Sequence, residues 1–208
     1  MNDKNSTDTS FRAFTASPQY PLHMLFLTLV LTVSLVEFNA IIFPPKVTSL
    51  NFWALFAAYF GAFSTWFGII IVGSQRKYTD TFLAKLWVTC GSIMIIAYLG
   101  VMYFAARASD SFFWYMWGWV FVYIFYWFSI FFRKLDLHLP EPVGWCSMHL
   151  ALAITAATAY SIWAWIFPPI PQIANWAFVF VALVIIVSYR QLMRFSHTWR
   201  KEFAKPKM

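Results

Sequence analysis

One acidic residue, Glu37, lies well inside a long apolar run that extends from Leu22 to Phe43. It precedes the end of that run by about six residues, a depth on the order of 9 Å if the run is a membrane-spanning helix. A carboxylate at such a depth is costly, so it usually faces a bundle interior, a cavity or an opposite charge. We therefore predict that Glu37 either carries an ion or proton or forms a structural ion pair with Arg107 or Lys46.

Two histidines are candidates for ligating a haem iron or a metal ion. His23 and His149 lie at comparable depth near the starts of their apolar runs, and imidazoles from two helices are common ligands of haem and of transition metals. No HxxxH or CxxC spacing accompanies them. Histidines that only meet water at the membrane interface are the alternative. The sequence therefore identifies no particular cofactor.

Sequence signatures of the common catalytic sites are missing. The chain has no glycine-rich phosphate loop, no G-x-S-x-G nucleophile elbow and no HExxH zinc motif. No arginine repeats at every third position within an apolar run, which argues against a voltage sensor. These observations favour a protein that is not an enzyme.

The composition requires lipid around much of the surface. Hydrophobic residues make up 61% of the 208 residues and charged residues only 11%, which is too little polar material to cover a soluble globule. Six apolar runs are near the length of a helix that crosses about 30 Å of hydrocarbon. We therefore predict an all-α membrane protein, a bundle of six transmembrane helices. The runs are Leu22 to Phe43, Phe52 to Gly73, Phe82 to Ala106, Phe112 to Phe132, Trp145 to Phe167 and Ile173 to Val187.

The distribution of lysine and arginine predicts the orientation of this bundle. Basic residues gather around the second and fourth loops and after the sixth run, whereas the opposite side holds only Lys46 and Arg107. By the positive-inside rule, both termini then lie in the cytoplasm, and we expect the inner membrane of a prokaryote. The net charge of +7 flanks the apolar runs instead of forming a soluble patch, so nucleic acid is not an expected partner.

Three parts follow one another along the chain. Residues 1–20 form a polar, flexible cytoplasmic N-terminus without the pattern of a signal peptide, so we expect the first span to be retained. Residues 21–189 form the transmembrane domain, and residues 190–208 form a basic tail. The apolar and basic side chains of the tail fall on opposite helical faces, which is typical of a helix on anionic lipid headgroups. Docking of a cytoplasmic protein is the alternative. The expected lipid contacts are Arg190, Arg194, Trp199, Lys201 and Lys205.

Small and aromatic residues predict how the helices pack. Ala153, Ala157 and Ser161 form a small-xxx-small row on the fifth run, and a second such row lies beside it. Small residues let helices approach closely, so we expect the fifth run to be the hub of the bundle. The fourth run is aromatic throughout its length. This favours a peripheral helix that faces lipid, or a wall that binds an apolar ligand such as a quinone.

These observations lead to three functional hypotheses from different classes. The first is a non-enzymatic subunit or scaffold of a membrane complex, which associates with other membrane subunits or with itself. The second is a small cation- or proton-linked channel or transporter that uses Glu37. The third is a membrane redox protein that binds haem through His23 and His149, or a quinone.

Overall fold

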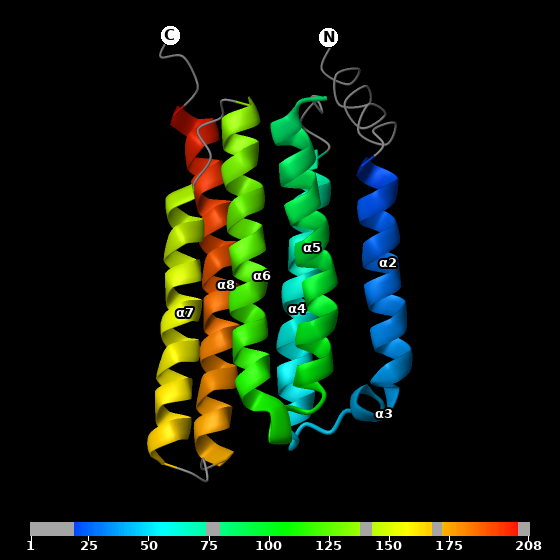
Figure 1. The fold of residues 1–208 in the computed structure, drawn as a ribbon, viewed down its shortest axis with the longest axis vertical. Coiled ribbons are helices and arrows are strands. Elements are labelled where there is room, and N and C mark those ends of the chain that lie inside the picture. The colour runs from blue at the N-terminus through cyan, green and yellow to red at the C-terminus, as the bar shows by residue number, and fades with distance from the viewer. Residues whose placement is uncertain (1–18, 74–79, 138–142, 168–171, 204–208) are drawn as a thin grey trace.

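The computed structural model of the chain describes residues 19–73, 80–137, 143–167 and 172–203. Every regular element in these ranges is an α-helix, as the apolar runs predict. The long helices run side by side, and the short α3 turns away from the end of α2 (Figure 1). The helices are α2 (Gln19–Glu37), α3 (Asn39–Ile42), α4 (Leu50–Gly73), α5 (Phe82–Ala105), α6 (Ala108–Leu137), α7 (Val143–Ile166) and α8 (Gln172–Phe203).

Three of these helices are long and apolar enough to cross a bilayer. The segments are Phe82–Ala105 of α5, Ala108–Asp136 of α6 and Cys146–Ile166 of α7. The shortest of them has 21 residues, which corresponds to about 31 Å of helix and therefore matches a hydrocarbon core. The described residues of α2 and α8 contain shorter apolar stretches, Thr28–Glu37 and Gln172–Ser188. The coarse prediction of a helical membrane protein is thus supported.

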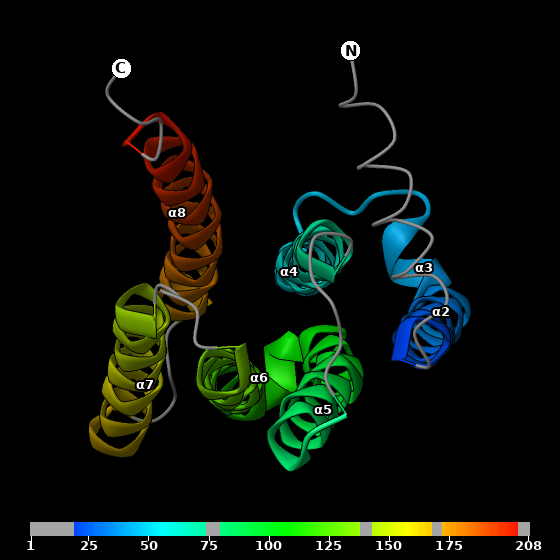
Figure 2. The ribbon, with the colours of Figure 1, turned by 90° about the horizontal axis from the view of Figure 1, so that it is seen from above.

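The helices form two rows when the bundle is seen along its axis. Helices α5, α6 and α7 make one row, and α2, α4 and α8 lie along the other (Figure 2). The start of α2 and the end of α8 lie at the same end of the bundle, called here the proximal end (Figure 1). Helix α3 and the turn between α5 and α6 lie at the opposite end, the distal end (Figure 1).

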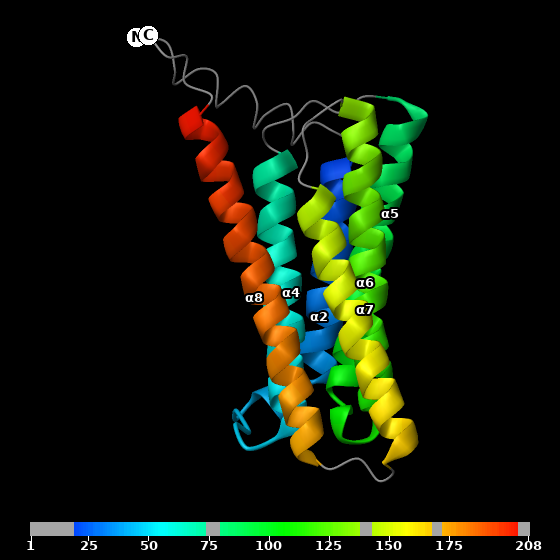
Figure 3. The same ribbon diagram turned by 90° about the vertical axis from the view of Figure 1, so that its left-hand side faces the viewer.

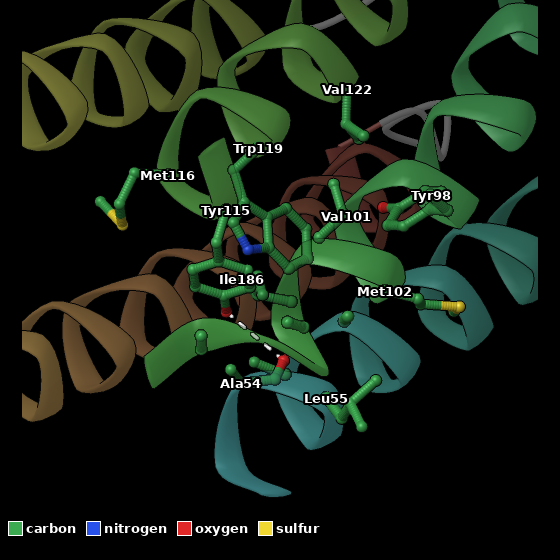
Figure 4. Packing of buried hydrophobic residues seen from close by; sticks show 14 of the residues in the cluster. Ala54, Leu55, Tyr98, Val101, Met102, Tyr115, Met116, Trp119, Val122 and Ile186 are labelled. Atoms are coloured by element: carbon green, nitrogen blue, oxygen red, sulfur yellow. Dashed lines mark hydrogen bonds between the residues drawn. The ribbon is translucent and has the colours of Figure 1, made fainter. Parts of the chain in front are cut away.

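The aromatic helix α6 occupies the centre of the bundle. It packs most extensively against α5, then against α7, and it also contacts α4. Tyr115 is completely buried and Trp119 almost so, and their rings meet edge to face (Figure 4). The Tyr115 hydroxyl donates a hydrogen bond to the Ala54 carbonyl of α4, at 3.5 Å. The prediction that the fifth run is the hub and the fourth is peripheral is therefore wrong.

Helix α7 uses only one of its two rows of small residues inside the bundle. Ala153 and Ala157 are buried in the core, and the Ser161 hydroxyl accepts a hydrogen bond from Trp117 Nε1 at 3.1 Å. The other row, which we call the outer row, is exposed along its whole length. Because α7 ends its row of helices, it packs only against α6 and α8 to any large extent (Figure 2). The outer row consists of Ala151, Thr155 and Ala159.

Helix α2 lies at the edge of the bundle and packs mainly against α5. Among its described side chains, the buried ones form one narrow stripe, Val30 and Ser34 in the helix and Phe38 just after it. These positions are four residues apart, so they share one helical face. Leu31, beside this stripe, is half-buried against the same core, and other described side chains, such as Leu29 and Val36, are exposed. Within its described part, α2 is thus held by few side chains.

Hydrogen bonds between side chains join α5 to α6 at the proximal end. Thr81 is the N-cap of α5, where its hydroxyl accepts a hydrogen bond from the Ala84 N–H at 3.0 Å. The same hydroxyl donates to the Asp136 carboxylate of α6. About two turns deeper, Ser129 Oγ donates to the carbonyl of Trp87 at 3.0 Å. Thr81 therefore caps one helix and ties it to the next.

The variant Thr81→Val is expected to lower the free energy of unfolding by about 1–2 kcal/mol. Valine keeps the shape of the side chain but removes both the cap acceptor and the donor to Asp136. Thermal unfolding in mild detergent measures the loss. The matched control is Thr89→Val, because the Thr89 hydroxyl bonds only the Lys85 carbonyl of its own helix and the residue is exposed. Equal effects of the two variants would contradict the role of Thr81.

Helix α8 is a single helix of 32 residues that continues well past its apolar stretch. It runs on in nearly the same direction without a bend (Figure 3). Most side chains that define the predicted lipid-binding tail belong to this last part, whose side chains lie outside the described residues. Those of Arg190, Arg194, Trp199 and Lys201 are in this group, and Lys205 follows the described helix. The contact with anionic lipid therefore stays a prediction.

Candidate functional site

Glu37 is the last residue of α2, at the distal end of the bundle. The helix stops here because Phe38 leaves helical geometry, with φ −106° and ψ 11°. Phe38 is itself 4% exposed, so its ring anchors this break in the core. The following turn, α3, points away from the bundle axis (Figure 1). Glu37 therefore lies at a helix end.

The structure brings Glu37 close to one of its two predicted partners. Arg107 Nη2 lies 4.0 Å from Glu37 Oε1, and the side chains are 43% and 56% exposed, respectively. Lys46 is exposed in the connection between α3 and α4 and forms no ion pair with Glu37. Of the settings expected for this carboxylate, the structure shows the opposite charge and not the bundle interior, because Glu37 ends α2 and is half exposed beside Arg107.

Arg107 is positioned by the turn between α5 and α6. Its backbone carbonyl accepts hydrogen bonds from the N–H groups of Asp110 at 3.0 Å and Ser111 at 2.8 Å. Asn51 Oδ1 of α4 accepts from the Ser109 N–H at 3.0 Å, which fixes the same turn. The guanidinium carbon of Arg107 lies 4.0 Å from the centre of the Tyr103 ring, a cation–π arrangement.

The energetics of this pair are those of exposed charges. A half-exposed ion pair contributes about 0–1 kcal/mol to stability, and a separation of 4.0 Å is longer than a charge-assisted hydrogen bond. The pair therefore does little to hold α2 in place. The Glu37 carboxylate and the Arg107 guanidinium can therefore both form hydrogen bonds with a third group.

The two candidate haem or metal ligands lie on helices that are far apart. His23 belongs to α2 and His149 to α7. These helices stand on opposite lateral sides of the bundle, with α5 and α6 between them (Figures 1 and 2). This arrangement argues against the ligation of one iron or metal ion by both imidazoles. The side chain of His23 lies outside the described residues.

His149 is completely buried between α7 and α8. Its Nε2 lies 3.4 Å from the Ser188 hydroxyl of α8, a long hydrogen bond. Among the described residues, no group of three or more His, Cys, Asp or Glu side chains could hold a metal ion. In the described structure, His149 joins two helices.

Two contacts of polar side chains were not predicted from the sequence, one inside the bundle and one at its distal end. Inside, the Thr65 and Tyr98 hydroxyls share a buried hydrogen bond of 2.9 Å between α4 and α5. At the distal end, Tyr103 contacts Arg107, and their spacing of four residues favours such a contact where a helix continues. No comparable signal exists for Thr65 and Tyr98, because neither sequence position reveals which helices become neighbours.

Comparisons with known proteins add no family to this description. No protein-family model matches the chain, and neither curated proteins nor solved structures give a match.

Proposed function

We propose that the chain is a non-enzymatic subunit or scaffold of a membrane complex and that its outer row on α7 contacts a partner helix. The observation that carries this proposal is the exposure of Ala151, Thr155 and Ala159, while the parallel row on the same helix is packed in the core. Small residues bring helix backbones close together in lipid. The outer row offers the same close approach to another chain, either a different subunit or a second copy.

The proposal includes six crossings of the membrane. Helix α4 has 24 residues and is therefore about 36 Å long, and α2, α4 and α8 stand alongside the three apolar helices named above (Figure 3). The loops and the tail that are rich in lysine and arginine then lie at the proximal end. By the positive-inside rule this end faces the cytoplasm, in a prokaryotic inner membrane.

The geometry gives less support to the two alternative functions. A cation or proton path through the bundle needs polar groups along its interior, whereas Glu37 lies at a helix end beside Arg107. A haem held by His23 and His149 requires helices that are neighbours, and α2 and α7 are not (Figure 2). The subunit hypothesis needs neither residue.

A pair of leucine substitutions on α7 tests the proposal. Ala159→Leu adds bulk to the outer row, so a partner that co-purifies in mild detergent is expected to be lost while the melting temperature stays the same. Ala157→Leu adds the same bulk to the inner row, where Ala157 has no exposed surface. This variant is expected to lower the free energy of unfolding by about 1–3 kcal/mol. A wild-type protein that runs as a lone monomer, without an associated chain, would contradict the proposal.

A further inference from the structure

We propose that Glu37 and Arg107 bind the headgroup of a zwitterionic phospholipid with a primary amine, of the phosphatidylethanolamine class. In this arrangement the phosphate accepts hydrogen bonds from Arg107, and the lipid ammonium donates to Glu37. One acyl chain lies along the exposed face of α5. This proposal is independent of the partner surface on α7.

The two charges match this headgroup in sign, spacing and exposure. The 4.0 Å between Arg107 Nη2 and Glu37 Oε1 leaves the pair without a short direct hydrogen bond. Both side chains are roughly half exposed at the distal end of the bundle, at the level where headgroups lie if the helices span the bilayer. A phosphoethanolamine group carries an anion and an ammonium next to each other, so it satisfies both charges at once.

Tyr103 orients the guanidinium for this contact. Its ring faces the guanidinium of Arg107, with 4.0 Å between the guanidinium carbon and the ring centre. A cation–π contact uses the positive charge of the guanidinium and not a hydrogen bond to an oxygen atom, so the N–H groups of Arg107 can still donate to other acceptors. These groups fit two phosphate oxygens in the bidentate geometry that arginine prefers.

An exposed track for the acyl chain leads away from Arg107 along α5. Ile96, Gly100 and Tyr103 lie four and three residues apart in α5, so they share one helical face, and Arg107 follows in the turn after this helix. Tyr103 and Ile96 are 45% and 49% exposed. A Cβ atom built on Gly100 would meet no other atom within 4 Å. The face is therefore open at Gly100, between two exposed apolar side chains.

The length of this track fits one leaflet. Nine residues of helix from Ile96 to Ala105, the end of α5, rise about 14 Å, which is close to half of a hydrocarbon core of about 30 Å. The headgroup site and the acyl track thus have the spacing of one phospholipid molecule. A soluble zwitterion would fill only the polar part of the site.

Native mass spectrometry of the full chain in mild detergent tests the proposal with three lipids that carry the same acyl chains. Phosphatidylethanolamine is expected to remain bound as one molecule per chain, at least about tenfold more than phosphatidylcholine. The choline headgroup has no N–H to donate to Glu37, and a charge-assisted hydrogen bond is worth about this factor. Phosphatidylglycerol, which lacks an ammonium, is expected to bind as weakly as phosphatidylcholine.

Substitutions of the two charges identify the contacts. Glu37→Gln is expected to reduce phosphatidylethanolamine retention to the phosphatidylcholine level, and Arg107→Gln to reduce retention of all three lipids. Asp110→Asn and Lys46→Gln are matched controls, because both residues are exposed charges at the same end. They are expected to leave retention unchanged. Because all four side chains are at the surface, unchanged melting temperatures show that the variants are folded.

Gly100→Leu tests the acyl track separately from the charges. The added side chain occupies the open face, so retention of phosphatidylethanolamine is expected to fall at least about fivefold. Ala159→Leu adds the same bulk to the exposed face of α7 and is expected to have no effect on retention. Equal retention of the three lipids, a preference for phosphatidylglycerol, or Glu37→Gln and Gly100→Leu variants that bind like the wild type would each overturn the proposal.

Discussion

Replacing Trp119 by alanine is expected to lower the free energy of unfolding by about 3–5 kcal/mol, the usual loss when a large buried aromatic side chain is removed. Trp119 is only 4% exposed and meets the rings of Tyr98, Tyr115 and Tyr123. Its removal leaves a cavity among three packed helices. Thermal unfolding in mild detergent, followed by the helical circular dichroism signal, measures the change.

The matched control for this variant is Trp114→Ala on the same helix. Trp114 is 57% exposed, so its loss changes the lipid-facing surface more than the core. We expect its effect to stay below about 1 kcal/mol. If both substitutions destabilised the protein equally, α6 would not be the central helix of the bundle.

A second large effect is expected at Gly61, where α4 meets α6. A Cβ atom at this position would lie 2.6 Å from Cη2 of Trp119, which is far shorter than a van der Waals contact. The Trp119 ring has little room to move because aromatic rings surround it. Gly61→Ala is therefore expected to cost about 1–3 kcal/mol, despite the better helix propensity of alanine. The melting temperature in mild detergent reports this loss.

Two further variants separate overpacking from helix propensity. Gly100→Ala adds a methyl group in open space, so it is expected to stabilise the protein by up to about 1 kcal/mol. Trp119→Phe removes the ring atoms that meet Gly61. In that background Gly61→Ala is expected to cost much less, and this non-additivity is the sign of a direct contact. Additive effects would show that Gly61 and Trp119 do not clash.

The helices themselves could be predicted from the sequence because apolar length and turn residues determine them locally. The predicted start of α5 at Phe82 agrees with the structure. The end of α2 could not be predicted, since apolar residues resume after Glu37 and Asn39 and continue to Phe43 while the backbone turns at Phe38. This single turn places Glu37 at a helix end.

The sequence could not predict which helices become neighbours in the bundle. His23 and His149 have similar positions along their runs, yet these positions do not reveal that α2 and α7 lie on opposite lateral sides of the bundle. The hub was predicted wrongly for the same reason. Ala157 and Trp119 are both buried, so a row of small residues and an aromatic face are both compatible with close packing. Which helix has neighbours on several sides depends on the whole bundle.

The position of α2 has a consequence for biosynthesis. Its main contact is α5, whose last residue, Ala105, is made 68 residues after Glu37. At roughly 5–20 residues per second, the ribosome needs on the order of several seconds for this stretch. During that time the face formed by Val30, Ser34 and Phe38 has no α5 to cover it. Helix α2 must therefore wait in the insertion machinery or in lipid, and its docking onto α5 is a late event in assembly.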